Sequence, residues 1–102
     1  MKVDFPPKLT GETRNYQWDF TGSLALGETV ITATVTAAVW SGNDATPSAL
    51  ISGGAAVASP LVTQLVTGGV AGTIYKLVCA AVTSAGQTID GYGLLAVLGD
   101  YK

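Results

Sequence analysis

Hydrophobic and polar residues alternate along much of this chain with the two-residue period of a β-strand. In residues 13–20, Tyr16, Trp18 and Phe20 share one face, and the residues between them are polar. Residues 29–40 are rich in β-branched side chains, which favour strands. The pattern therefore predicts one strand in each of these two segments.

The second half of the chain continues the alternation on both sides of a turn. Residues 73–83 and 87–98 flank Ser84-Ala85-Gly86, a sequence typical of a β-hairpin turn. Shorter apolar segments predict additional strands at residues 48–52, 55–58 and 61–67. No segment shows a helical period, so the chain is expected to be all-β.

Turns separate these strands at fairly regular intervals. The clearest is SGNDATP at residues 41–47, where nearly every residue type favours a turn. About seven to eight short strands arranged in this way predict an antiparallel sandwich, with a barrel as the alternative. Both tryptophans are expected to pack in the core, Trp40 from the end of its strand. The other predicted core residues are Tyr16, Ile31, Val35, Tyr75, Leu77, Cys79 and Leu95.

Residues 1–12, MKVDFPPKLTGE, are expected to form an extended N-terminal arm ahead of a sandwich domain at residues 13–102. Two adjacent prolines favour polyproline geometry and cannot donate backbone hydrogen bonds. We expect the arm to reach a neighbouring subunit rather than its own core; a first edge strand of the same sandwich is the alternative. Its candidate contact residues are Val3, Phe5, Pro6, Pro7 and Leu9.

Composition limits the classes of function. Charged residues make up only 12% of the 102 residues, against about 25% in ordinary domains. Such a surface suits a protein packed against others, or simply a β domain built from small residues. A net charge of −2 without a basic cluster disfavours nucleic-acid binding. No apolar run reaches the roughly 18–20 residues of a membrane helix, and the N-terminus lacks a signal-peptide pattern, so folding in a cytoplasm is expected.

Candidate chemistry is sparse. The chain has no histidine and one cysteine, which excludes Cys/His zinc sites, Ser-His-Asp triads and Cys-His dyads. The seven acidic residues are scattered, and none is spaced as an acid/base pair. No catalytic, cofactor-binding or metal site is predicted, and the chain is not expected to be an enzyme.

Two smaller features have competing interpretations. Cys79 alternates with Tyr75 and Leu77, so we expect it to be a buried apolar side chain; a reactive thiol would need an electropositive setting. Gly91 and Gly93 could mark a β-bulge or admit a closely approaching backbone, and the bulge is the more common case.

Several segments together resemble a known family. They are FPPK at 5–8, Y-x-W-D-F at 16–20, LALGETV at 24–30, VWSG at 39–42 and GGVAGTIYKLVCAAVTSAGQT at 68–88. These pieces span most of the chain and resemble small immunoglobulin-like structural proteins of tailed bacteriophages, the fibre–tail adaptor or head–tail region proteins. Residues 43–60, rich in Ala, Ser and Gly, depart from that pattern.

The resemblance implies an immunoglobulin-like sandwich and a non-enzymatic virion subunit made in the host cytoplasm. Its implied partners are other virion proteins, namely portal, connector, tail or fibre subunits, in a symmetric assembly that includes copies of itself. It would act at the head–tail region or between tail and fibres. Capsid decoration is one alternative. A carbohydrate-binding module is another, for which Trp18, Trp40 and Tyr92 would have to form an exposed platform.

Overall fold

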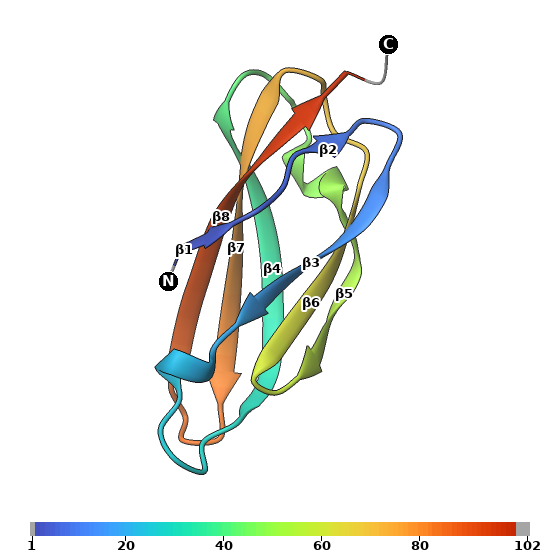
Figure 1. The fold of residues 1–102 in the computed structure, drawn as a ribbon. Coiled ribbons are helices and arrows are strands. Elements are labelled where there is room, and N and C mark those ends of the chain that lie inside the picture. The colour runs from blue at the N-terminus through green and yellow to red at the C-terminus, as the bar shows by residue number, and fades with distance from the viewer. Residues whose placement is uncertain (1, 100–102) are drawn as a thin grey trace.

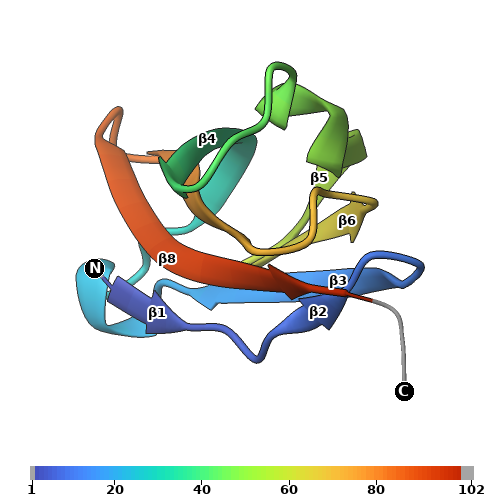
Figure 2. The same ribbon diagram turned by 90° about the horizontal axis from the view of Figure 1, so that it is seen from above.

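The computed structural model describes residues 2–99 and consists of two β-sheets packed face to face (Figures 1 and 2). The described segments include two short 3-10 turns, η1 (Thr21–Ser23) and η2 (Pro47–Leu50). The strands are β1 (Lys2–Asp4), β2 (Lys8–Leu9), β3 (Thr13–Asp19), β4 (Val30–Ser41), β5 (Ile51–Ala58), β6 (Leu61–Thr67), β7 (Thr73–Thr83) and β8 (Thr88–Leu98).

The larger sheet has the order β1-β8-β7-β4, with β2 further along the same edge of β8. The smaller sheet has the order β3-β6-β5. The predicted all-β sandwich is therefore confirmed, and this order is consistent with an immunoglobulin-like arrangement. The expectation of purely antiparallel pairing is wrong at one edge, because β1 and β2 both run parallel to β8.

The N-terminal segment forms that parallel edge instead of standing apart. Val3 lies opposite Gly93 and Lys8 lies opposite Val97. Between these two short ladders the chain contains Pro6-Pro7, where a missing backbone donor interrupts no pairing. The alternative of a first edge strand thus describes residues 2–9 within this domain, and their contact with a neighbouring subunit stays a prediction. Met1 and residues 100–102, part of the expected arm and domain ranges, lie outside the described residues.

Phe5 packs against the opposite sheet and so connects this edge to it. Its ring lies edge-on to Tyr16, with centroids 5.1 Å apart, and to Trp18, with centroids 5.3 Å apart. Tyr16 and Trp18 belong to β3, so the aromatic contact joins the two sheets at their edges. This is the apolar anchoring expected of Phe5, but the partner is its own domain.

Gly93 makes room for the aromatic contact. A Cβ built on Gly93 would collide with the Phe5 ring and lie 2.7 Å from the Val3 carbonyl oxygen. The β7–β8 ladder passes this residue without a register shift, so the bulge interpretation is wrong for Gly93. Glycine is required here because a neighbouring strand and ring approach the backbone closely.

Lys8 provides a second fastening that the sequence pattern did not single out. The residue is fully buried, and its Nζ donates hydrogen bonds to the carbonyl oxygens of Gly68, at 2.6 Å, and Leu9, at 2.8 Å. Burial lowers the pKa of the ammonium group, while the nearby Glu12 carboxylate acts to raise it. The Gly68 bond connects β2 to the loop that follows β6.

The predicted core is confirmed at Tyr16, Trp18, Val35, Tyr75, Leu77, Cys79 and Leu95, all of which are buried. The prediction is wrong for Ile31 and Trp40, whose side chains are 58% and 60% exposed. Ile31 lies where the ladder to β7 shifts register, between Val30 and Thr32, whereas Trp40 is exposed in step with the alternation of Val35, Ala37 and Val39. A one-residue shift moves a side chain to the other face, so Val30 is buried in place of Ile31.

The two short strands expected at 48–52 and 55–58 are instead one 3-10 turn and one strand. Pro47 begins η2, which ends at the buried Leu50. From there β5 continues as a single strand, but its ladder to β6 is irregular between Ser52 and Ala56.

Removing the Phe5 ring should destabilise the domain. Phe5→Ala is expected to lower the free energy of unfolding by about 2–3 kcal/mol, less than for a fully buried phenylalanine because Phe5 is partly exposed. Urea denaturation would measure the change. Leu26→Ala, which truncates an exposed loop residue, should change stability by about 0.5 kcal/mol or less. Equal stability of Phe5→Ala and wild type would show that the edge does not hold the sandwich together.

Cys79 should react slowly in the folded protein. The side chain is buried on β7, and burial, followed by the Asp90 carboxylate, raises the pKa of its thiol to about 11. At pH 8 only about one thiol in a thousand would be the reactive thiolate. Labelling with a chromogenic disulfide reagent should be slow in buffer and rapid in denaturant. Similar rates in both would contradict a buried structural role.

Candidate attachment surfaces

The outward side of the larger sheet is unusually apolar. Side chains alternate along β7 and β8, so one set fills the core and the other faces away from it. We call this second set, with Trp40 of β4, the outer sheet face. Besides Trp40 and Lys76 it contains the apolar residues Ile74, Val78, Ala80, Val82, Tyr92, Leu94, Ala96 and Leu98, each partly or largely exposed, and the polar Thr88 and Asp90 near the start of β8. Contiguous exposed apolar surface of this kind marks interaction sites.

Lys76 lies at the centre of this face between two aromatic residues. Its Nζ is 4.9 Å from the ring centroid of Tyr92 and 6.0 Å from that of Trp40. Both distances are within the range of cation–π attraction, so the rings hold the ammonium group against the sheet. The arrangement presents a positive charge flanked by two aromatic side chains, the residue types that dominate binding energy at protein interfaces.

Sequence reasoning placed Trp40 in the core because it ends a strand with buried neighbours. The inward residues of β4 in this region are Val35, Ala37 and Val39, and strict alternation then directs Trp40 outward. The signal was present in the sequence, but the assumption that a tryptophan prefers the core overrode it. The sequence suggests Tyr92 only as part of a sugar-binding platform, and no pattern in it points to Lys76.

The candidate residues of the arm divide into two groups. Val3 and Phe5 are partly buried and pack against the core of their own domain. Pro6, Pro7 and Leu9 keep exposed side chains. Only this second group remains accessible to another protein.

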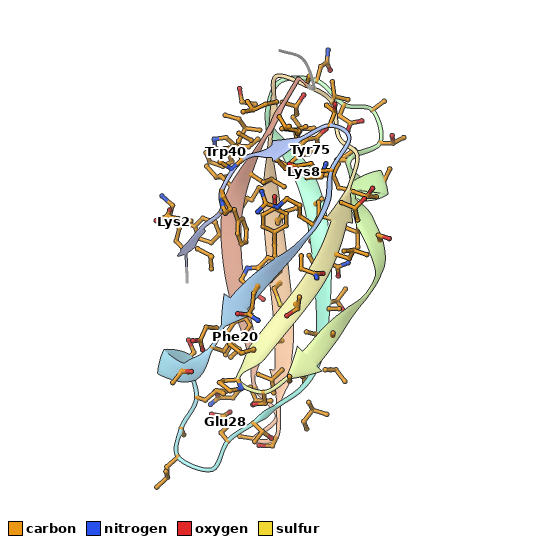
Figure 3. The ribbon with its side chains drawn as sticks, turned by 45° about the vertical axis from the view of Figure 1, so that its right-hand side comes forward. Lys2, Lys8, Phe20, Glu28, Trp40 and Tyr75 are labelled. Atoms are coloured by element: carbon orange, nitrogen blue, oxygen red, sulfur yellow. The ribbon has the colours of Figure 1, made fainter. Side chains whose placement is uncertain are left out.

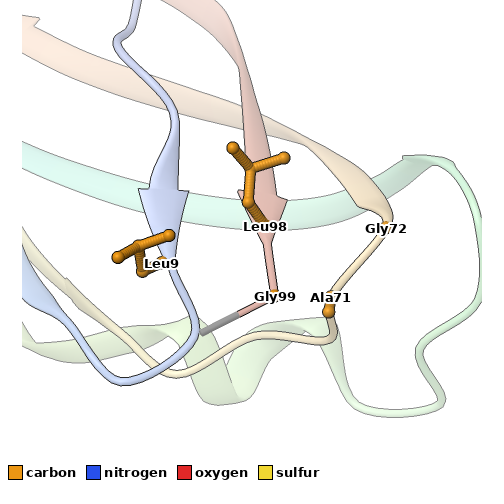
Figure 4. A pocket seen from close by; sticks show the side chains of 5 residues that line it. All are labelled: Leu9, Ala71, Gly72, Leu98 and Gly99. Atoms are coloured by element: carbon orange, nitrogen blue, oxygen red, sulfur yellow. The ribbon is translucent and has the colours of Figure 1, made fainter. Parts of the chain in front are cut away.

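Leu9 takes part in a second apolar surface at one end of the sandwich. Leu9 lines a shallow hollow of about 600 Å³ together with Leu98 and Gly99 at the end of β8, and Ala71 and Gly72 from the loop between β6 and β7 (Figure 4). No titratable side chain contributes to this lining. Its chemistry suits a small apolar contact rather than a reaction.

Two carboxylates act as structural acceptors. The Tyr75 hydroxyl donates to Asp44 Oδ2 at 2.6 Å and accepts from the backbone N–H of Val70, which ties together two loops. This hydrogen bond, and another from the Thr46 N–H, lower the pKa of Asp44. Tyr75 and Lys8 lie toward one end of the molecule (Figure 3).

Glu28 performs the same task at the opposite end (Figure 3). It accepts hydrogen bonds from the backbone N–H of Ala25 and from the Thr83 hydroxyl, and these lower the pKa of its carboxyl group in that order. The carboxylates of Asp44 and Glu28 therefore hold loops in place by accepting hydrogen bonds.

The part of the chain that the structure describes contains no group of three or more His, Cys, Asp or Glu residues that could hold a metal ion. Within the same residues, no helix has the length and apolar character needed to cross a membrane.

Comparison with known proteins gives one family. The model described as "Podophage GP4 fiber-tail adaptor protein gp77" matches residues 8–93, which include β2 through most of β8. No curated protein matches the chain.

The two tryptophans should differ sharply in accessibility. Acrylamide should quench the exposed Trp40 efficiently and the fully buried Trp18 poorly. A Trp40→Phe variant, whose emission comes from Trp18 alone, should resist quenching until the protein is unfolded. Strong quenching of native Trp40→Phe would place Trp18 at the surface and contradict the core described above.

Proposed function

The chain belongs to the podophage GP4 fibre–tail adaptor family, and we propose that it is a non-enzymatic virion subunit that connects tail fibres to the tail. The observation that carries this proposal is the family match, which covers residues 8–93 and thus most of the sandwich. An adaptor needs a rigid body and surfaces for other proteins, and its residues need no chemistry beyond binding.

The outer sheet face is the proposed principal contact. Trp40 and Tyr92 would enter apolar depressions of a tail or fibre subunit, while Lys76 between them would meet a polar or acidic group. Because these side chains point away from the core, they can contact another protein without any change in core packing. The sheet beneath them holds the rings in a fixed arrangement, which lowers the entropy lost on binding.

The N-terminal segment contributes a smaller contact in this proposal. Leu9 and Leu98 expose neighbouring apolar side chains at the ends of β2 and β8, and Pro6-Pro7 forms an exposed extended connection. We therefore retain Pro6, Pro7 and Leu9 as candidate contacts with other virion proteins. Val3 and Phe5 support the contact indirectly by holding the segment on β8.

Two alternative functions receive less support. Capsid decoration would also use an apolar sheet face, but the matching family is described as a fibre–tail adaptor. A carbohydrate platform needs open aromatic faces for sugar stacking. Lys76 lies over Tyr92, and Trp18 is fully buried, so the three aromatic residues considered for such a platform do not form one.

Truncating the outer aromatic pair should weaken attachment without unfolding the domain. A Trp40→Ala/Tyr92→Ala variant is expected to bind tail or fibre subunits about 10–100-fold more weakly, since interface aromatics are frequent hot spots. Its melting temperature should stay close to that of wild type, because both side chains are substantially exposed. Particles assembled with the variant should carry fewer fibres, counted by electron microscopy.

The matched control is Leu26→Ala, which removes an exposed apolar side chain away from the outer sheet face. It should leave fibre number unchanged. Normal fibre number with the aromatic variant would exclude this face as the contact. Absence of the protein from purified wild-type particles would overturn the adaptor function itself.

A further inference from the structure

The edge strands on the two sides of the sandwich differ in their content of charged residues and proline. On one side lie β1, β2 and β3. All three strands carry charged residues, and Pro6-Pro7 connects β1 to β2. On the other side lie β4 and β5, whose sequences VITATVTAAVWS and ISGGAAVA contain no charge and no proline. Charges and prolines are the usual means by which proteins prevent unwanted pairing of edge strands. Only one side of this molecule has that protection.

β4 is a long strand with one unpaired edge. The strand has twelve residues and pairs with β7 on one side, except at the two register shifts, and the sheet order ends at β4 on the other side. Alternate backbone N–H and C=O groups along β4 therefore point away from β7. One of them, the Val30 N–H, donates to the Ser59 hydroxyl at 3.0 Å, which caps only the start of the edge.

The neighbouring β5 leaves space beside this edge instead of covering it. The two strands belong to different sheets and lie side by side without a shared ladder (Figure 2). A cleft of about 240 Å³ separates them, lined by Ala33, Thr34 and Val35 of β4 and by Gly53, Gly54 and Ala55 of β5. A Cβ on either glycine would meet no atom within 4 Å. The irregular, side-chain-free part of β5 thus faces the middle of β4.

Gln64 shapes the same cleft from below. Its Nε2 donates to the carbonyl oxygens of Ser52 and Gly53, which fixes the irregular part of β5 in place. Its Oε1 is buried and has no donor among the described residues. Hydrogen-bonding capacity on this side of the sandwich is therefore unused both along β4 and within the cleft.

From these observations we infer that β4 pairs antiparallel with β4 of a second copy of this chain, about a two-fold axis near the middle of the strand. The outward side chains there are Thr32, Thr34 and Thr36, and an antiparallel self-pairing sets threonines against threonines, a favourable cross-strand combination. In a self-paired strand a charge near the two-fold axis would meet its own copy, and β4 has no charged residue.

The geometry also limits the assembly to two copies. An isologous contact uses the same edge of both partners, so pairing consumes the one uncharged, unpaired edge of the larger sheet and closes. With Thr34 at the two-fold axis, Val30 lies opposite Ala38, and the ladder extends over about 30 Å of the 48 Å length of the molecule. It would join the larger sheets of both copies and make their outer sheet faces continuous.

The test measures the oligomeric state of the full chain by sedimentation equilibrium over a range of concentrations. Wild type is expected to be a dimer. Thr34→Lys and Thr34→Glu alter an exposed side chain, so both should fold, which circular dichroism and thermal melting would verify. Each should dimerise at least about tenfold more weakly, because identical charges would face each other across the two-fold axis. Thr88→Lys, at an exposed threonine of β8 two strands away, should remain dimeric.

Mixing Thr34→Lys with Thr34→Glu should restore the dimer, since opposite charges would then meet. Only pairing of β4 with another β4 predicts this rescue. Hydrogen exchange should show protection of alternate β4 amides in the dimer and its loss in the Thr34→Lys monomer. A monomeric wild type, an unaffected Thr34→Lys dimer or failure of the mixture to associate would each overturn the inference. The first of these results leaves fibre–tail attachment untouched, because that function is tested separately on particles.

Discussion

The packing of Phe5 against Tyr16 and Trp18 is the contact on which the arrangement of this molecule depends. It closes one side of the sandwich by tying β1 and β2, at the edge of the larger sheet, to β3 at the edge of the smaller one. Gly93 permits the contact, and the buried Lys8 holds the same segment to the loop after β6. With this side closed by the chain's own N-terminus, the surfaces proposed for other proteins are the outer sheet face, the exposed Pro6, Pro7 and Leu9, and the opposite side at β4.

Alternation made most of the fold predictable from sequence. A strand with one face in the core must place apolar residues at every second position, so Tyr16 and Trp18, or Leu77 and Cys79, were assigned correctly from spacing alone. Ile31 was mispredicted because the backbone departs from the period there: β4 shifts register between Val30 and Thr32, and no residue type in that strand predicts the shift. Trp40 keeps the alternation and faces outward.

The candidate contacts were harder to predict because they depend on pairs distant in sequence. Phe5 looked like an anchor for a partner, and only the opposing Gly93, 88 positions later, reveals that its pocket lies within the same domain. Likewise, Lys76 becomes a candidate contact residue only because Trp40 and Tyr92 lie beside it. The β4–β7 ladder brings Trp40 close, and the β7–β8 ladder brings Tyr92 close. Periodicity describes which face a side chain occupies, but not which neighbours it finds there.

The two faces of the larger sheet are separate in role: one forms the core, and the other is the proposed contact surface. Residues such as Tyr75 and Leu77 face inward and secure the fold, while Lys76 between them faces outward with the aromatic pair. Because neighbouring positions on one strand serve different tasks, an outward residue can change with its partner protein at little cost to stability. A chain with only 12% charged residues can then offer broad apolar contact while its core remains closed. Sparse charge is therefore a property of the proposed contact surface as much as of the core.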